Sequence, residues 1–394
     1  MKVPGRVCVA DGLSTRADAA DASREALESV ADRIGANPDL ALVFITPHHA
    51  AQAHRVLEDL RGILGADVVV GCTASGVIGA GREVQSGPGL AVWSARLPGT
   101  RVQGFHLRLE ETEEGNFVRG WPEVGPDVSA VLLGDPFSFP VEPFLASLRR
   151  EKKAPTLVGG LASGATRPGG NRFFMDDRVF DNGAVGFVIA GPMRLQPLVS
   201  QGCKPVGKPF VVTRCERNVI YELGGAPAYD GLGSVLAEMD EDERRRFSRA
   251  PQVGLRAASD PGSKDGSGGY LIRGLMGVDR RSGAVAVTDH VYKGLELQFH
   301  TRDGASAHEE LQSLLALASA LNPESEGALL FCCNGRGVDM FDSPDHDVGE
   351  VRTFFPGVPA VGMFAAGEIG PVLGQPYLHS FTASLGFLVQ AAGG

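Results

Sequence analysis

The stretch VVGCTASGVIG, from Val69 to Gly79, decides the fold, because the chain repeats its pattern twice more. The other two copies read LVGGLASGATR (157–167) and AVGMFAAGEIG (360–370). When they are aligned on Gly71, Gly159 and Gly362, each copy shows Gly-x-x-Ala-x-Gly after an apolar run. Repetition on this scale indicates a supersecondary unit that has been duplicated.

Each copy lies between two further apolar runs. The runs that precede the copies are ALVFI, AVLLG and ALLFCC, and those that follow are LAVWSA, AVGFVIAG and SLGFLV. Short apolar runs bounded by turn residues favour buried strands. After Pro47, apolar residues at helical spacing predict a helix between the first strand and the second. The repeating unit is therefore predicted to be βαββ, with the last strand antiparallel to its neighbour.

The two ends of the chain share more than this unit. A predicted helix precedes the first copy (15–34) and another precedes the third (307–321), and each follows an Asp-Gly-x-Ser segment. The predicted fold is thus α/β, with two pseudo-symmetric modules of mixed β-sheet and helices packed on the outer faces. We place the modules at residues 1–200 and 201–394.

The middle of the chain does not show the repeated pattern. Hairpins are predicted at 211–225 and around the turn at 281–283, a short helix at 227–240, and an exposed Gly/Ser/Asp-rich loop at 259–269.

Composition excludes several classes of protein. A net charge of −10 argues against nonspecific nucleic-acid binding. Six cysteines without a Cys-x-x-Cys motif argue against a disulfide framework or a zinc site, so neither a metal nor a cofactor is expected. No apolar run approaches about 18 residues, and the N-terminal segment has no signal-peptide apolar region. We therefore expect a cytoplasmic protein without a membrane span.

An ordered set of motifs resembles the FIST family, which has tandem FIST N and FIST C modules. The FIST N mark is Gly-Cys-Ser/Thr-x-x-Gly after a strand, here Gly71 to Gly76; FIST C is matched by QGCKPVGKPFVVT, NVIYELGGAPA, YLIRGLMGVDRRSGAVAV, FCCNGRG and GMFAAGEIGP. The resemblance spans about residues 25–390. One departure is that the usual Gly-Glu-Ile after the first loop is Gly-Val-Ile here, whereas Glu368 keeps the acid in the third copy.

The resemblance implies a noncatalytic sensory module of signal transduction that binds a small ligand such as an amino acid. It also implies a partner protein for output, which the sequence does not identify, since no F-box, kinase or cyclase segment is evident. Two other readings stay open. One is an enzyme of unrecognised type that uses Cys72, Arg336 and Glu368, and the other is a protein-interaction scaffold whose loops are purely structural.

The candidate ligand-binding residues gather on the glycine loops and strand ends, where glycines let a backbone approach a ligand and strand carboxyl ends collect binding groups. The set is Gly71, Cys72, Thr73, Ser75, Gly76, Asn334, Arg336, Gly337, Glu368 and His379. No catalytic or metal-binding residue is assigned. Cys72 is replaced by Gly160 and Met363 in the sister loops, which favours a packed, unreactive thiol.

Arg336 and Glu368 follow the first and second strands of the third unit. If these strands are neighbours, the two side chains can clamp the carboxylate and ammonium of a zwitterion. The structural alternatives are a salt bridge from Arg336 to Asp339, Asp342 or Glu350, and a backbone cap made by Glu368.

Overall fold

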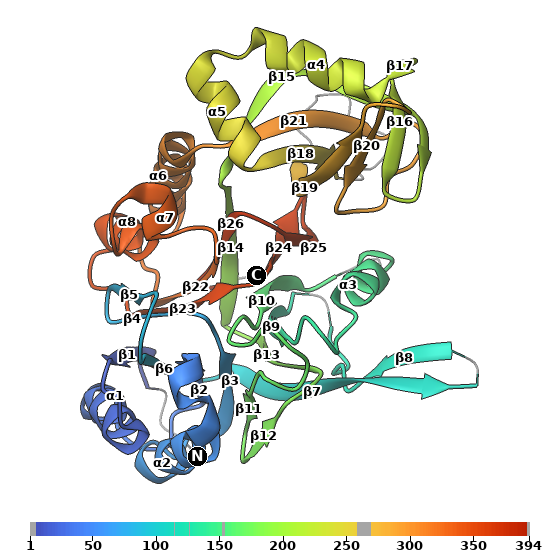
Figure 1. Ribbon diagram of the computed structural model, residues 1–394. Helices are drawn as coiled ribbons and strands as arrows, with labels where there is room; N and C mark the ends of the chain where they lie inside the picture. Colours follow the sequence, from blue (N-terminus) through green and yellow to red (C-terminus); the bar gives the residue numbers. More distant parts are fainter. Residues whose placement is uncertain (1–4, 114, 126, 152–153, 258–268, 392–394) are drawn as a thin grey trace. The chain divides into compact units, whose positions relative to one another are not determined.

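The computed structural model describes residues 5–113, 115–125, 127–151, 154–257 and 269–391 (Figure 1). It divides into two compact units. Unit 1 comprises residues 1–200, 312–378 and 382–394, and unit 2 comprises 201–311 and 379–381. One division of the chain falls after Ser200, and the third repeat belongs to unit 1 together with the first two. The predicted loop at 259–269 lies outside the described residues except for Gly269.

Unit 1 contains three sheets of one design. The first has the order β1-β6-β2-β3-β11-β12 (Cys8–Ser14, Leu90–Arg96, Leu40–Ile45, Val68–Thr73, Phe173–Met175, Arg178–Phe180). The second has the order β8-β7-β13-β9-β10-β24-β25 (Gly115–Arg119, Arg101–Thr112, Ala184–Ala190, Ser129–Gly134, Thr156–Leu161, Glu368–Val372, Gln375–His379). The third has the order β14-β26-β22-β23-β4-β5 (Met193–Gln201, Thr382–Gln390, Gly327–Cys333, Ala360–Ala365, Val77–Gly79, Arg82–Val84).

In every sheet, the first two strands of a repeat are parallel and its last strand is antiparallel to the first. A helix or 3-10 helix connects the parallel strands. These helices are η1 and α2 (Pro47–Gln52, Ala53–Ile63), α3 (Val141–Arg149), and α7 and α8 (Val338–Phe341, His346–Phe354). The predicted α/β class and the βαββ order are confirmed.

The repeats exchange strands in a cycle, which the sequence did not reveal. After each glycine loop a short hairpin leaves its own sheet and pairs with the second strand of a sister repeat. Thus β4 pairs with β23, β11 pairs with β3, and β24 pairs with β10. One backbone hydrogen bond repeats at each exchange, as Thr73 N to Arg172 O, Leu161 N to Gly367 O and Phe364 N to Gly76 O. The three repeats therefore obey a pseudo-threefold arrangement within unit 1.

The first glycine of each loop has a packing role. A Cβ on Gly71 would lie 1.8 Å from the carbonyl oxygen of Val43, and a Cβ on Gly159 or Gly362 would lie 2.0 Å from the equivalent oxygen of the neighbouring parallel strand. No side chain larger than hydrogen fits at these positions without moving the backbone. The recurrence of this glycine is thus explained by strand packing, independently of any ligand.

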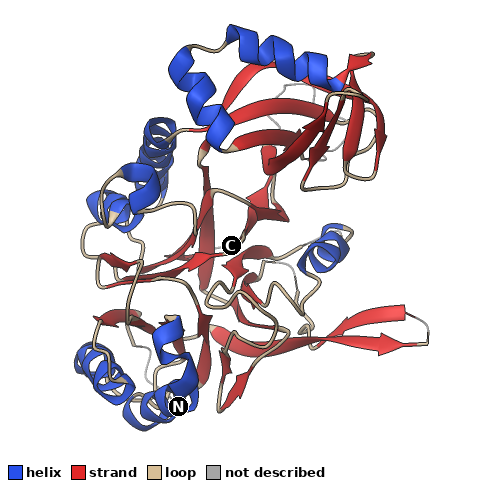
Figure 2. Ribbon diagram, viewed as in Figure 1, coloured by secondary structure: helices blue, strands red, loops and turns tan. Residues whose placement is uncertain are grey.

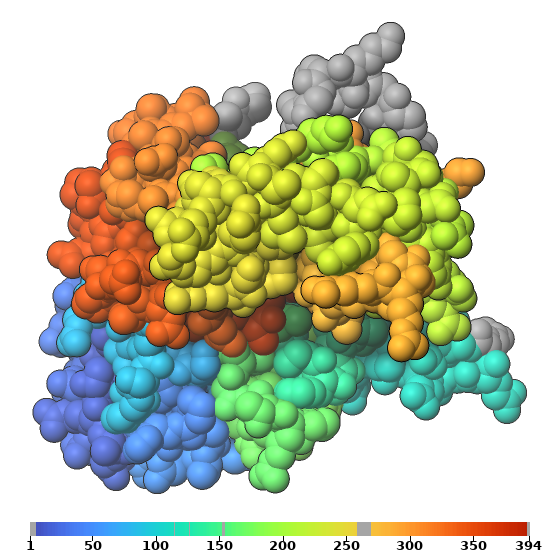
Figure 3. Space-filling view, turned by 45° about the horizontal axis from the view of Figure 1, so that its top comes forward, coloured from blue at the N-terminus to red at the C-terminus, as the bar shows by residue number. Residues whose placement is uncertain are grey.

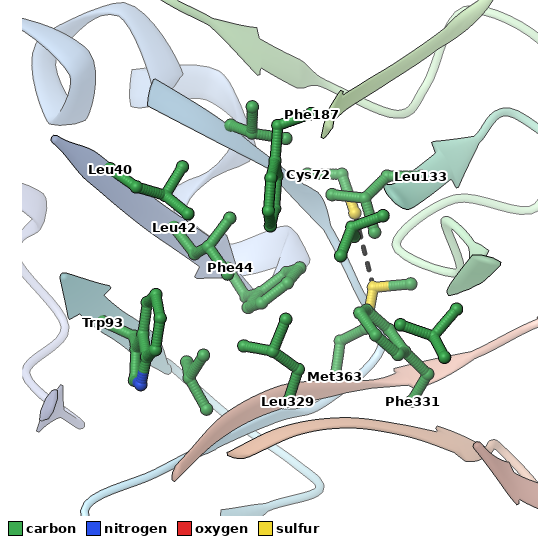
Figure 4. Packing of buried hydrophobic residues seen from close by; sticks show 14 of the residues in the cluster. Leu40, Leu42, Phe44, Cys72, Trp93, Leu133, Phe187, Leu329, Phe331 and Met363 are labelled. Carbon is green, nitrogen blue, oxygen red and sulfur yellow. Dashed lines mark hydrogen bonds between the residues drawn. The ribbon is translucent and has the colours of Figure 1, made fainter. Parts of the chain in front are cut away.

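The main core of unit 1 lies where the three sheets meet. Figure 4 shows Cys72 pointing at Met363, with their sulfur atoms 3.4 Å apart, among Phe44, Leu133 and Phe331. Cys72 and Met363 occupy equivalent positions of their repeats, and the third equivalent is Gly160, where a Cβ would lie 3.1 Å from the Met363 methyl carbon. The three loops carry different residues at this position because a single space in the core must accommodate all three of them.

Helices cover the outer faces of the sheets (Figure 2). Helix α1 (Ala19–Ile34) packs with α2 over the first sheet, where Leu27, Val30 and Leu60 are fully buried. Asp18 caps α1, since its side chain accepts from the N–H groups of residues 20 and 21. Thr46 precedes η1, and its hydroxyl accepts from the N–H of Gly89 and makes no cap to that helix.

Unit 2 is a separate antiparallel structure. Six strands close on themselves in the order β15-β21-β18-β19-β20-β16, with β17 added at β16 (Cys203–Glu216, Glu296–Arg302, Pro251–Arg256, Tyr270–Asp279, Ala284–Val287, Val219–Leu223, Ala226–Pro227). Helices α4 and α5 (Ala228–Glu238, Glu241–Arg249) form one of its faces, yellow in Figure 3. The predicted hairpins at 211–225 and 281–283 are present.

The division between the units falls within α6 (Gly304–Leu321). The helix begins at Gly304, three residues before the predicted start at 307, and the Ser306 hydroxyl donates to the Asp303 carboxylate.

Candidate functional site

The glycine loops leave the carboxyl ends of the parallel strands β3, β10 and β23. Ser75 and Ser163 occupy equivalent loop positions and contact each other, because the N–H of Ser75 donates to the Ser163 hydroxyl at 2.8 Å. The Ser75 hydroxyl donates to the Asn334 side-chain oxygen at 2.7 Å, and the Ser163 hydroxyl donates to the carbonyl of Phe364. Residues from all three repeats therefore meet at one half-buried polar cluster.

Arg336 lies just beyond β22 and is completely buried. Its Nε and Nη2 donate to the two carboxylate oxygens of Asp347 at 2.7 and 2.8 Å, and its guanidinium lies over the Phe341 ring. Burial raises the pKa of Asp347, but the charge and hydrogen bonds of Arg336, together with the neighbouring His346, hold that pKa well below its usual range. The salt-bridge partner is thus Asp347, a residue the sequence argument did not name, and the bridge is buried instead of exposed.

A second carboxylate approaches this bridge from the first repeat. Glu83 lies on β5, is 8% exposed, and accepts from the N–H of Val348 at 3.1 Å. Burial and the nearby Asp347 charge raise the pKa of Glu83 to about 7. The two carboxylates therefore have pKa values displaced in opposite directions, because only Asp347 has the guanidinium as its partner.

Glu368 begins β24 and is also completely buried. Its Oε2 accepts from the N–H of Thr382 at 3.1 Å, so it caps the backbone at the start of β26. Burial raises the pKa of Glu368 well above its ordinary value, against the opposing effects of the Thr382 N–H and the Arg336 charge. The capping role and the proximity to Arg336 both exist, whereas the direct salt bridge of Arg336 is made with Asp347.

Two polar atoms of this cluster have no hydrogen-bond partner in the described structure: Nη1 of Arg336 and Oε1 of Glu368. Buried polar groups are nearly always hydrogen-bonded, so a fully buried donor and a fully buried acceptor without partners call for an explanation such as a bound molecule. Cys333 lies at the same place, because its thiol hydrogen-bonds to Glu368. Adjacent residues of a strand point to opposite faces, and Cys332 is the buried member of this pair.

The remaining loop candidates have structural partners. Gly71 and Cys72 are buried in β3, and burial raises the pKa of the Cys72 thiol. The Thr73 hydroxyl donates to Asn171 at 3.1 Å, and Gly76 accepts from the N–H of Phe364. Gly337 lies beside the Gln85 side chain at the start of α7. None of these five residues is included in the site proposed below.

Three further polar residues lie at or just after the ends of other strands. Asp135, at the end of β9, accepts from Asn171 and Ser138 and is thereby satisfied. His49, after β2, is buried, and burial followed by the His48 charge lowers its pKa. His379 is buried and belongs to unit 2.

A cavity of about 620 Å³ lies at the opposite ends of the strands of unit 1. Its lining includes Arg6, Met193, Glu326 and Gln390, which flank the beginnings of β1, β14 and β22 and the end of β26. Its charged and amide side chains are exposed or half-buried, and Ser325 is buried. The buried cluster of Arg336 and Glu368 therefore offers more specific groups for binding a ligand than this cavity does.

Comparisons with known proteins agree with the motif pattern. A FIST N domain matches residues 39–226 and a FIST C domain matches residues 228–371. An uncharacterized protein of Mycobacterium tuberculosis is 36% identical over 383 residues, which cover 96% of this chain and 99% of the relative. An uncharacterized protein of Mycobacterium bovis is 35% identical over 383 residues, covering 96% and 98%. Among the described residues, no helix is long and apolar enough to cross a membrane.

Proposed function

The chain belongs to the FIST family, and on that premise we propose that it is a cytoplasmic, noncatalytic sensory protein whose ligand is a small zwitterion such as an amino acid. FIST domains are generally sensory domains of signal transduction. The output passes to a partner protein that remains to be identified.

The observation that carries the ligand proposal is the pair of orphaned atoms, Arg336 Nη1 and Glu368 Oε1. A guanidinium N–H is a donor and suits a carboxylate. A carboxylate oxygen is an acceptor and suits an ammonium group. An α-amino acid carries both groups a few ångströms apart, so one molecule can satisfy both atoms at once.

The bridge to Asp347 supports this assignment, because it fixes the guanidinium. Nε and Nη2 are occupied, and only the Nη1 edge is available to a ligand. A preorganised donor of this kind loses little conformational freedom on binding. Entry is proposed through the segment at Asn334 and Ala366, which are exposed next to the buried residues.

The surroundings of Cys72 do not favour it as the nucleophile of the alternative enzyme hypothesis. Cys72 is fully buried against Met363 in the hydrophobic core, and burial raises the pKa of its thiol. A reactive cysteine needs a lowered pKa and access to a substrate. This position instead supports a packing role.

The test is a thermal-shift and calorimetric screen of the full chain against the twenty amino acids, with simple carboxylates and amines as single-group controls. At least one amino acid should stabilise the protein, by about 2.7 kcal/mol at a concentration one hundred times Kd. The single-group controls should stabilise it much less. If no amino acid in the panel binds, the zwitterion assignment is wrong.

The variant Glu368→Gln tests whether the ligand binds at Glu368. Glutamine keeps an acceptor for the Thr382 N–H and resembles the protonated acid, so folding should be retained. Loss of a charged hydrogen bond costs about 1.5–3 kcal/mol, or roughly 10- to 150-fold in affinity. Glu326→Gln is the matched control, because this half-buried acid lies just before β22, at the other end of the sheet. An amino acid that binds wild type and Glu368→Gln equally well must occupy another site.

Binding should also depend on pH. Since the pKa of Glu368 is raised, the unliganded carboxyl is protonated at pH values where an exposed acid is ionised. An ammonium ligand requires the ionised form, so binding releases a proton. Affinity should therefore rise about tenfold per pH unit up to the pKa of Glu368 and level off above it.

A further inference from the structure

The hairpin of β7 and β8 projects from the rest of unit 1 (Figure 1). Strand β7 pairs with β13 only as far as Leu107, and the pairing with β8 begins at the next residue. We call residues 108–113 and 115–119 the arm. Every residue of the arm is exposed except Leu109 and Val118, which are half-buried. Since a two-stranded hairpin is at best marginally stable in water by itself, the arm stands to gain from contact with a partner.

Strand β8 is the edge strand of the second sheet, so one side of its backbone has no neighbouring strand among the described residues. Proteins commonly block such edges with a lysine, a proline or a β-bulge. Strand β8 has none of these, because its sequence is Gly-Asn-Phe-Val-Arg and its register with β7 is unbroken. The edge is therefore open to hydrogen bonding with another strand.

The charges of the arm are separated along its length. The outer end carries Glu110, Glu111 and Glu113, all exposed. The inner end carries Arg108 and Arg119, which lie directly opposite each other on the two strands. Like charges in this position destabilise a strand pair, and the Glu110 carboxylate, 2.7 Å from Nε of Arg119, relieves only part of the repulsion. A further acidic group brought to the inner end would therefore be favourable.

We propose that β8 pairs antiparallel with β8 of a second copy of this chain, so that the two arms form one continuous sheet across a twofold axis. A pairing centred on Phe117 sets residue 115 of each copy opposite residue 119 of the other. The acidic end of each arm then lies along the arginine end of its partner, and the twofold axis makes this contact occur twice. Phe117, which is 41% exposed, meets its own counterpart, and aromatic pairs stabilise neighbouring strands.

A second copy is favoured over a strand of another protein because the order of charges is self-complementary. An antiparallel partner must be basic beside the acidic end of the arm and acidic beside its basic end. The arm itself meets this requirement, whereas a parallel pairing of two arms would bring like ends together. The proposal is independent of the proposed ligand, since neither Arg336 nor Glu368 belongs to the arm.

The experiment is sedimentation equilibrium of the full chain at up to about 300 μM, because pairing of short strands is expected to give a Kd of about 1–300 μM. The chain should form dimers, and rising salt should weaken them because the charges are exposed. Phe117→Lys sets two lysines opposite each other and should raise Kd at least about fivefold. The matched control is Phe137→Lys, since Phe137 is 42% exposed in the same unit and lies outside the arm.

The control should leave Kd unchanged. A chain that stays monomeric throughout this range overturns the proposal, as does a dimer that Phe117→Lys and Phe137→Lys affect equally. All the substituted residues are exposed, so folding should be retained, and the melting temperature of each variant checks this.

Exchange of charges tests the antiparallel direction. Arg119→Glu should weaken the dimer, and so should the double variant Glu111→Arg with Glu113→Arg, because each brings like charges together at both ends. An equimolar mixture of these two proteins should form a heterodimer that is tighter than either homodimer, since opposite charges then meet again. If mixing gives no tighter dimer, the antiparallel pairing of the two arms is wrong.

Discussion

Replacing Arg336 by methionine should destabilise unit 1 severely, and replacing Asp347 by leucine in the same chain should restore most of the loss. The guanidinium and the carboxylate are 0% and 3% exposed, and two hydrogen bonds of 2.7 and 2.8 Å join them. Removing the cation alone leaves a buried carboxylate whose remaining side-chain partner is His346, at 2.9 Å from the carboxylate oxygen. That situation costs about 3–5 kcal/mol, whereas replacing both partners by apolar residues is often close to neutral.

The assay is urea unfolding followed by tryptophan fluorescence. Both tryptophans, Trp93 and Trp121, belong to unit 1, so the signal reports this unit without a contribution from unit 2. The four proteins of a double-mutant cycle give the coupling energy between Arg336 and Asp347. We expect a value of about 3 kcal/mol, at the upper end for contacting residues.

An exposed ion pair of the same unit is the matched control. Arg119 and Glu110 also approach to 2.7 Å, but their side chains are 66% and 53% exposed. Removing this pair should cost no more than about 1 kcal/mol. If Arg336→Met costs as little as Arg119→Met, or if the double replacement is as unstable as the sum of the single ones, the argument from burial is refuted.

Three other predictions concern Glu83, the glycine positions and Cys72. Because burial raises the pKa of Glu83 to about 7, its contribution to the free energy of unfolding should be complete below about pH 4.5 and be lost as the pH rises through 7. The loss is about 3 kcal/mol, and Glu83→Gln should remove this part of the pH dependence in urea unfolding. Gly71→Ala should cost about 3 kcal/mol or more or prevent folding, since its Cβ would meet a carbonyl oxygen at 1.8 Å. Gly62→Ala, in open space on α2, should stabilise by about 0.5–1 kcal/mol in the same unfolding assay. Cys72→Ala should cost about 1 kcal/mol or less, and a thiol reagent should label Cys72 only on unfolding; rapid labelling of the native protein would revive Cys72 as a nucleophile.

The repeat was readable from sequence because its physical cause is local. A glycine is required wherever the backbone of a neighbouring strand comes too close for a Cβ, and the three copies meet this constraint at Gly71, Gly159 and Gly362. The buried strands were equally visible, since each is a short apolar run. Positions under one steric constraint keep one residue type, so the pattern survives divergence of the rest of the chain.

The exchange of hairpins was not readable, because its strands are very short. Strand β4 has three residues, Val77 to Gly79, and β5 has three more. So few residues give no periodicity, and nothing local shows that they pair with β23, far along the chain. The exchange determines which side chains meet, and it brings Glu83 of the first repeat to Asp347 of the third.

The partner of Arg336 was missed for a related reason. Asp339 and Asp342 are nearer in sequence, and neither is the partner. Asp347 lies on helix α8 and its side chain is buried, so water is excluded from it. The buried Arg336 guanidinium needs an anion as its partner there, and Asp347 supplies it. Since Asp347 occupies Nε and Nη2 of Arg336, Nη1 is the buried donor of this group that has no partner in the described structure. The bridge that argues against a simple clamp between Arg336 and Glu368 is therefore the feature that would hold Nη1 in place for the carboxylate of the proposed amino acid ligand.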